Sequence, residues 1–193
     1  MTQPRGSDTI APMHVASVTE DEARLTLETL IELANGLLDG DLDQRSVLHT
    51  AGFSRAADAS EASVTRVRDR MEALLPFLTE LPDLDIDVAA AKISAELTEL
   101  PISPLIVDHG GVGHHIHWTP ATAKFDDQVF ADLLMALAGE VCANGTIRFG
   151  HCAADDCERL FYDATRNRSK KFCSDPRCAS RTHTADHRAR KRT

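Results

Sequence analysis

The sequence predicts a mainly α-helical protein: a helical N-terminal domain with a small β-hairpin, and a small C-terminal module built around cysteines. Three observations support this prediction. Apolar residues recur at three- and four-residue steps through much of residues 19–144. Four of the five cysteines lie between residues 152 and 178. The net charge changes sign at about the place where these cysteines begin.

Length and composition exclude several classes of protein. The chain has 193 residues, a net charge of −9 and 42% hydrophobic residues, which is typical of a globular chain with one good core. These values are not those of a long disordered chain or a coiled-coil rod. No run of about 18 apolar residues is present, so we expect no membrane partner. The N-terminus lacks the apolar segment of a secretory signal, and we therefore expect a cytoplasmic protein.

The distribution of charge predicts where the modules meet. Residues 1–150 hold 10 basic and 24 acidic side chains, a net charge of −14, whereas residues 151–193 hold 11 basic and 6 acidic side chains, a net charge of +5. We predict a flexible tail at 1–18, a helical domain at 19–144 and a separate module at 145–193.

The helical domain is predicted element by element. Apolar stripes indicate a helix that begins near Thr19 and ends at Gly40, a helix that begins after Ser60, and a weaker helix over 83–100. Two short extended runs within 101–118, joined by a Gly-rich turn, predict the hairpin. The strongest amphipathic pattern predicts a helix over 126–143.

This domain offers little chemistry. Its one candidate cluster is a set of four histidines: His109, His114, His115 and His117. In an extended strand, His115 and His117 share a face. We favour solvated or hydrogen-bonded histidines over a metal site. Phosphate-binding loops and nucleophile motifs are absent from the sequence, so we expect no enzyme. Cys142, the fifth cysteine, is expected to be a buried free thiol.

The remaining cysteines have the spacing of a structural zinc site. Two Cys-x4-Cys pairs, Cys152 with Cys157 and Cys173 with Cys178, are separated by fifteen residues. Four thiolates complete a tetrahedron at about 2.3 Å from one ion and leave no position for a reacting water. A disulfide framework is the alternative, but it needs an oxidising compartment. We therefore predict one structural zinc ion in a treble-clef-like or ribbon-like module that ends in a basic helix.

The module also carries two groups of cations. Asp175-Pro176 predicts the start of a helix that runs to about Arg192. At 100° per residue, five of its cations share a stripe of about 100°: Arg177, Arg181, Arg188, Lys191 and Arg192. A second group lies in the linker between the cysteine pairs: Arg166, Arg168, Lys170 and Lys171, with Asn167 among them. Cations on a metal-pinned helix suit phosphates, and Arg and Asn side chains can read base edges.

The sequence from Cys152 to Arg181 resembles the CGNR zinc finger. The matching residues are the two cysteine pairs with Phe161, Thr165, Asn167, Arg168, Ser169 and Phe172. The signature Cys-Gly-Asn-Arg is here Cys178-Ala-Ser-Arg181. In bacteria this finger typically follows an ABATE domain, so the resemblance implies an ABATE-like domain at 19–144. It also implies a stress-induced transcriptional regulator.

We therefore expect a regulator that binds DNA through the finger, with the acidic N-terminal domain sensing or binding a partner. A small-molecule or protein partner for that domain and a homodimer are left open. The alternatives are a zinc-thiolate redox sensor and a protein-interaction module that binds no DNA. The opposite charges of the two parts also allow the acidic domain to mask the basic helix.

Overall fold

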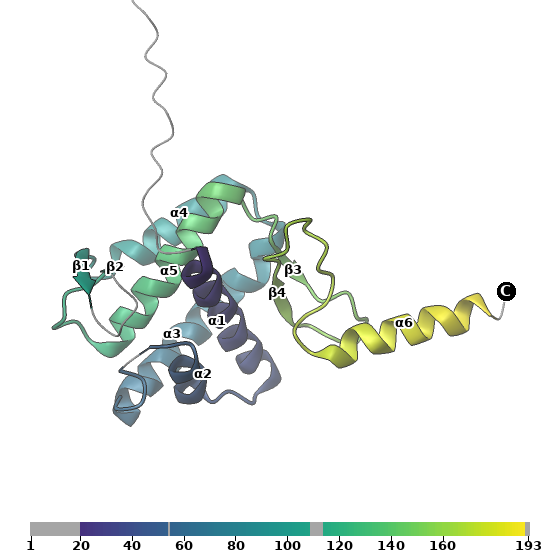
Figure 1. Cartoon of the computed structure of the whole chain (residues 1–193), viewed down its shortest axis with the longest axis horizontal. Helices are drawn as coiled ribbons and strands as arrows, with labels where there is room; N and C mark the ends of the chain where they lie inside the picture. The colour runs from purple at the N-terminus through teal and green to yellow at the C-terminus, as the bar shows by residue number, and fades with distance from the viewer. Residues whose placement is uncertain (1–19, 54, 109–113, 192–193) are drawn as a thin grey trace, which may run out of the picture.

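The computed structural model describes residues 20–53, 55–108 and 114–191. Within these ranges the chain forms six α-helices, one 3₁₀ helix and two antiparallel hairpins, which confirms the predicted mainly α fold class (Figure 1). The predicted N-terminal tail lies outside the described residues, as does Arg192. No helix in the described part of the chain is long and apolar enough to cross a membrane.

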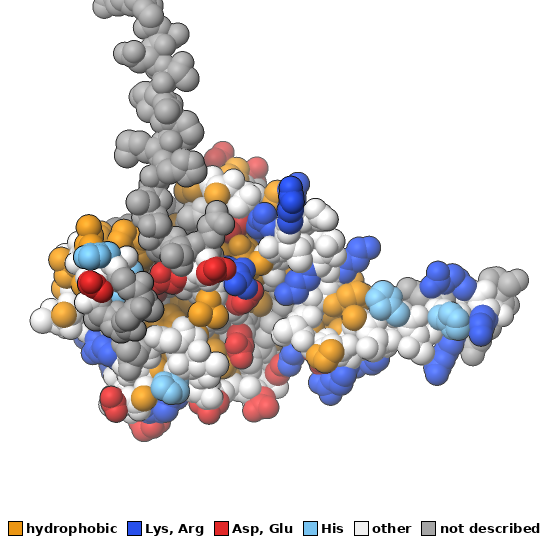
Figure 2. Space-filling view, in the orientation of Figure 1, with side chains coloured by type: hydrophobic (Ala, Val, Ile, Leu, Met, Phe, Trp, Pro, Cys, Tyr) orange, Lys and Arg blue, Asp and Glu red, His pale blue; other side chains and the backbone are white. Residues whose placement is uncertain are grey.

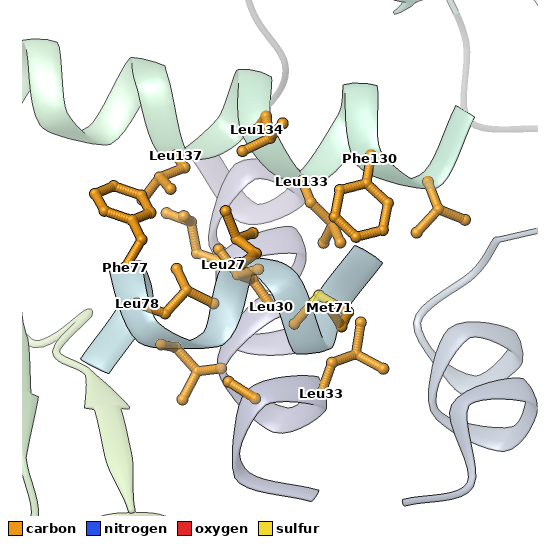
Figure 3. Packing of buried hydrophobic residues seen from close by; sticks show 14 of the residues in the cluster. Leu27, Leu30, Leu33, Met71, Phe77, Leu78, Phe130, Leu133, Leu134 and Leu137 are labelled. Carbon is orange, nitrogen blue, oxygen red and sulfur yellow. The ribbon is translucent and has the colours of Figure 1, made fainter. Parts of the chain in front are cut away.

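Three long helices form the core of the body. They are α1 (Glu20–Asp39), α3 (Glu61–Glu80) and α5 (Phe125–Asn144), and α4 (Ile86–Thr98) packs against α5. Figure 3 shows apolar side chains of α1, α3 and α5 pointing toward one another, among them Leu30, Met71 and Leu133, which are fully buried. The side chain of Ser60 caps α3 by accepting a hydrogen bond from the N–H of Ser63, as expected for a helix that begins there.

The hairpin predicted within 101–118 is present. Its strands β1 (Leu105–Asp108) and β2 (His114–His117) pair with Ile106 opposite Ile116. Within the helical body, two short elements were not predicted: α2 (Gln44–Thr50), which is capped by Asp43, and the 3₁₀ helix η1 (Leu81–Asp83). The weak helix expected over 83–100 is shorter at its start, because the carboxylate of Asp85 caps the first turn of α4.

The C-terminal module is joined to the body through its own hairpin. Strands β3 (Phe149–His151) and β4 (Leu160–Tyr162) are antiparallel, and Phe149, Leu160 and Tyr162 belong to the same buried cluster as the body helices. The Asn35 side chain on α1 donates to the Leu160 carbonyl at 3.0 Å and accepts from the Leu160 N–H at 2.8 Å. The buried edge of β4 is thus paired by a side chain of α1.

The last helix, α6 (Pro176–Arg190), extends away from the rest of the molecule (Figure 1). It begins as predicted, because the Asp175 carboxylate accepts from the N–H of Arg177 at 2.9 Å. In Figure 2, Lys and Arg side chains stand along this helix, while acidic side chains are spread over the body.

Candidate metal centre

Four cysteine side chains meet where the β3–β4 hairpin approaches the start of α6. Cys152 directly follows β3, and Cys157 closes a turn in which its N–H donates to the Ala154 carbonyl at 3.0 Å. Cys173 follows the long linker, and Cys178 lies in the first turn of α6. The N–H of Ala153 donates to the carbonyl of Lys171 at 2.8 Å, which holds the two cysteine pairs together.

The geometry of the sulfurs fits one tetrahedral ion. Four sulfurs at about 2.3 Å from a zinc ion are separated from one another by about 3.8 Å. The Sγ atoms of Cys157 and Cys173 are 3.9 Å apart, those of Cys173 and Cys178 are 3.7 Å apart, and all four lie within 4.8 Å of one another. All five cysteines are free, so a disulfide framework is not what gathers them. The four cysteines are positioned to bind one structural zinc ion.

The electrostatics of the thiols explain why a cation belongs among them. Burial raises the pKa of the Cys178 thiol to about 12, and the three neighbouring sulfurs act in the same direction. Burial also acts to raise the pKa of Cys152, but N–H groups of Cys173 and Ala154 point at its sulfur, and the balance is a lowered pKa. Four thiolates this close repel one another strongly unless a dication offsets part of their charge, and a bound metal deprotonates its thiols.

The histidines of the body form no comparable site among the described residues. His109 lies outside these residues. The Nε2 atoms of His115 and His117 are 3.2 Å apart, which agrees with the shared strand face. Burial and the charge of Glu22 raise the pKa of the nearby Asp132 to about 7. In the described part of the chain, only the four cysteines bring three or more candidate ligand atoms together.

The expectation of a buried Cys142 is wrong. Cys142 is exposed, whereas its neighbour Val141 is 2% exposed and faces the core. One residue is a rotation of about 100° on a helix, and this turns the Cys142 side chain away from the packed face of α5.

The linker between the cysteine pairs is a loop that internal hydrogen bonds hold in a defined conformation. The buried Asp163 carboxylate accepts from the N–H and hydroxyl of Thr165 and from the N–H of Lys170, at 2.6–2.8 Å. Arg168 takes a left-handed conformation with φ 49°. This fold exposes a group of predicted residues: Arg166, Asn167, Arg168 and Lys171. Lys170 is half-buried, and its Nζ donates to the Tyr162 carbonyl at 3.2 Å.

Two of the predicted α6 cations are engaged within the module. Arg177 pairs with Asp175 at 2.7 Å and, beside it, holds the pKa of that carboxyl below its usual range. Arg181 pairs with Asp156 at 3.1 Å and approaches the Cys178 sulfur. In the described part of the chain, no side-chain hydrogen bond or ion pair engages Arg188 or Lys191, and both are exposed. The helix ends at Arg190, within two residues of the predicted end at about Arg192, and Lys191 follows in a turn.

Sequence reasoning missed the residues that assemble the module. Asn35 and Arg159 join it to α1, with the Arg159 Nε donating to the Asp39 carboxylate at 3.1 Å. Asp163 organises the linker, and its position two residues before Thr165 is the pattern of an Asx turn, a local signal that was available. The Asn35 contact spans 125 residues and has no local signal.

The fold and the sulfurs together define a zinc-finger module appended to a helical body. Residues 148–191 match the family model of the CGNR zinc finger. The matched segment begins at the β3–β4 hairpin and includes all four clustered cysteines and α6. None of the curated proteins matches the chain at a significant level.

Proposed function

We propose that the chain is a bacterial transcriptional regulator that binds duplex DNA through its zinc finger. In this proposal residues 19–144 are an ABATE-type domain that senses a stress signal by binding a small molecule or a protein. The protein acts in the cytoplasm and has no catalytic role. The single observation that carries the proposal is the basic helix α6, which a metal centre anchors at one end and which projects from an acidic body.

The length and positive charge of α6 suit the major groove of DNA, which phosphates border on both sides. Its 15 residues give a length of about 22 Å, and the major groove of DNA admits an α-helix. Arg188 and Arg190 are two residues apart, which is about 200° around a helix, so cations lie on opposite sides of its far half. Arg190 was not among the predicted contacts. Because α6 has little apolar packing of its own, a partner whose phosphates contact its cations would stabilise the helix.

The exposed linker loop offers a second contact to the same partner. Arg166, Arg168 and Lys171 are exposed and make no side-chain hydrogen bond or ion pair in the described part of the chain. With Arg188 and Lys191 they form a set of five cations, which we call the outward cations. The cations that pair with carboxylates of the chain, Arg159, Arg177 and Arg181, are excluded from this set.

Removing two outward cations is expected to weaken DNA binding in a salt-dependent manner. If all five contact phosphates, the logarithm of the association constant falls with the logarithm of salt concentration with a slope of about −4 to −5. The double variant Arg188→Gln/Lys191→Gln is expected to reduce the slope to about −3 and to weaken binding at low salt at least about tenfold. Fluorescence anisotropy of a short labelled duplex, titrated at several salt concentrations, measures both quantities.

The matched control removes the same charge from the body. Lys92 and Lys124 are exposed on α4 and just before α5, and Lys92→Gln/Lys124→Gln is expected to bind as the unmodified protein does. Equal loss in the two double variants would show attraction by net charge alone. Undetectable binding of the unmodified protein at low salt would contradict the proposal and favour the redox or protein-interaction alternatives.

A further inference from the structure

Arg181 occupies a position that DNA binding does not explain. It lies one turn after Cys178 on α6, and its Nη2 is 3.5 Å from the Cys178 Sγ. The same nitrogen is 3.1 Å from a carboxylate oxygen of Asp156. Asp156 directly precedes Cys157 in the turn that carries the first cysteine pair. One guanidinium therefore contacts a ligand sulfur of the second cysteine pair and a carboxylate in the turn that carries the first pair.

We propose that Arg181 is a positioning residue of the zinc centre, which ties α6 to the first cysteine turn and holds the ion against release. The inference concerns the metal centre alone and stands whether or not the finger binds DNA. It also assigns a task to the arginine of the signature Cys178-Ala-Ser-Arg181.

The charge of the centre gives the physical reason. A zinc ion with four thiolates carries a net charge of −2, and the Cys178 sulfur is almost fully buried, with the residue 1% exposed. A buried negative charge needs a donor or a cation to offset lost hydration. The guanidinium stays charged at all relevant pH values and has five N–H donors, so one group can serve a sulfur and a carboxylate together.

The carboxylate of Asp156 orients the guanidinium of Arg181 and is not the main source of its stabilising effect on the zinc centre. The side chains of Arg181 and Asp156 are 52% and 65% exposed, and an ion pair that exposed contributes little by itself. The contact with the sulfur is the important one, and Asp156 restricts the rotamers from which Arg181 can make it.

The same side of the centre faces solvent. A groove of about 530 Å³ is bordered by Cys157, Cys178 and Arg181, together with Arg159 and Asp175. Chelators and oxidants would approach the centre from this groove, where Cys157 is partly exposed and Cys178 is buried. Arg181 donates a hydrogen bond to the Cys178 sulfur at the border of this groove. It is therefore placed to oppose the detachment of that sulfur from the metal.

The test is the rate at which the full-length, zinc-loaded protein releases zinc to a chromogenic chelator, with no DNA present. Removing a side chain that hydrogen-bonds to a metal ligand typically lowers the metal affinity by about ten- to a hundredfold. We expect Arg181→Met to accelerate zinc release by about tenfold or more. Arg181→Lys keeps the positive charge but loses the several N–H donors of the guanidinium, so its release rate should lie between those of the unmodified protein and Arg181→Met. Asp156→Asn is expected to accelerate release by less than Arg181→Met.

Arg188→Met is the matched control, because Arg188 lies on the same helix and touches no sulfur in the described part of the chain. It is expected to release zinc at the unmodified rate. Should Arg181→Met yield a protein that binds no zinc, faster release from Arg181→Lys than from Arg188→Met still supports the inference. Equal release rates for the unmodified protein, Arg181→Lys and every Arg181→Met sample that binds zinc overturn it. The DNA titration is independent, since loss of DNA binding leaves the zinc-release result unchanged.

Discussion

Cys173→Ser is expected to unfold the zinc end of the molecule while the helical body stays folded. Besides the four cysteines, the small buried cluster around the site contains Ala154 with Phe172 packed against it, which is too little apolar surface to hold the linker and α6 alone. Metal binding supplies on the order of 10 kcal/mol or more in modules of this kind. The body has its own large core on α1, α3 and α5, so we expect it to stay folded without the metal.

Hydrogen exchange read by mass spectrometry locates the loss. Protection is expected to disappear over residues 152–157 and 173–182, while α1 and α5 keep theirs. Strands β3 and β4 are expected to keep part of their protection, because Phe149, Leu160 and Tyr162 are packed in the body core. Cys142→Ser, an exposed cysteine outside the cluster, is the control and should leave exchange and zinc content unchanged. Native protection around the site in Cys173→Ser would refute the metal dependence.

Asn35→Ala is expected to lower the free energy of unfolding by about 2–6 kcal/mol. Asn35 is 6% exposed and Leu160 is 1% exposed. Alanine would leave the N–H and the carbonyl of Leu160 buried without their partners, and each such orphaned group costs about 1–3 kcal/mol. The contact also joins α1 to β4, so its loss should loosen the finger from the body.

Urea unfolding followed by the fluorescence of Trp118, the single tryptophan, measures this change. Glu32→Ala lies on the same helix with an exposed side chain and is expected to stay within about 0.5 kcal/mol of the unmodified protein. If Asn35→Ala unfolds at the same urea concentration as Glu32→Ala, the side-chain pairing with β4 contributes nothing.

Sequence reasoning succeeded where periodicity and local capping determine structure. The long helices were predicted because each buries a full apolar stripe, and the start of α6 was predicted because Asp175-Pro176 is a capping pattern. The clustering of the four cysteines was predicted because two pairs at this spacing match the ligand arrangement of a structural zinc site.

It failed where the structure depends on contacts between distant segments. The helix α2 has only 7 residues and one fully buried apolar side chain, Leu48, which is too short a pattern to detect. Strands β3 and β4 have three residues each and depend on distant segments, since β4 packs on α1 and β3 packs on η1. The spacing of the α6 cations along the sequence predicts which of them share a side of the helix, but it cannot show that Arg177 and Arg181 pair with carboxylates.

Zinc K-edge X-ray absorption on the purified full-length protein, combined with its metal content, tests the four-sulfur zinc centre itself. One zinc ion per chain, with four sulfur neighbours at about 2.3 Å and no nitrogen or oxygen in the first shell, is the predicted result. A nitrogen or oxygen ligand at about 2.0–2.1 Å, or a protein that is folded over residues 152–182 without bound metal, would contradict it.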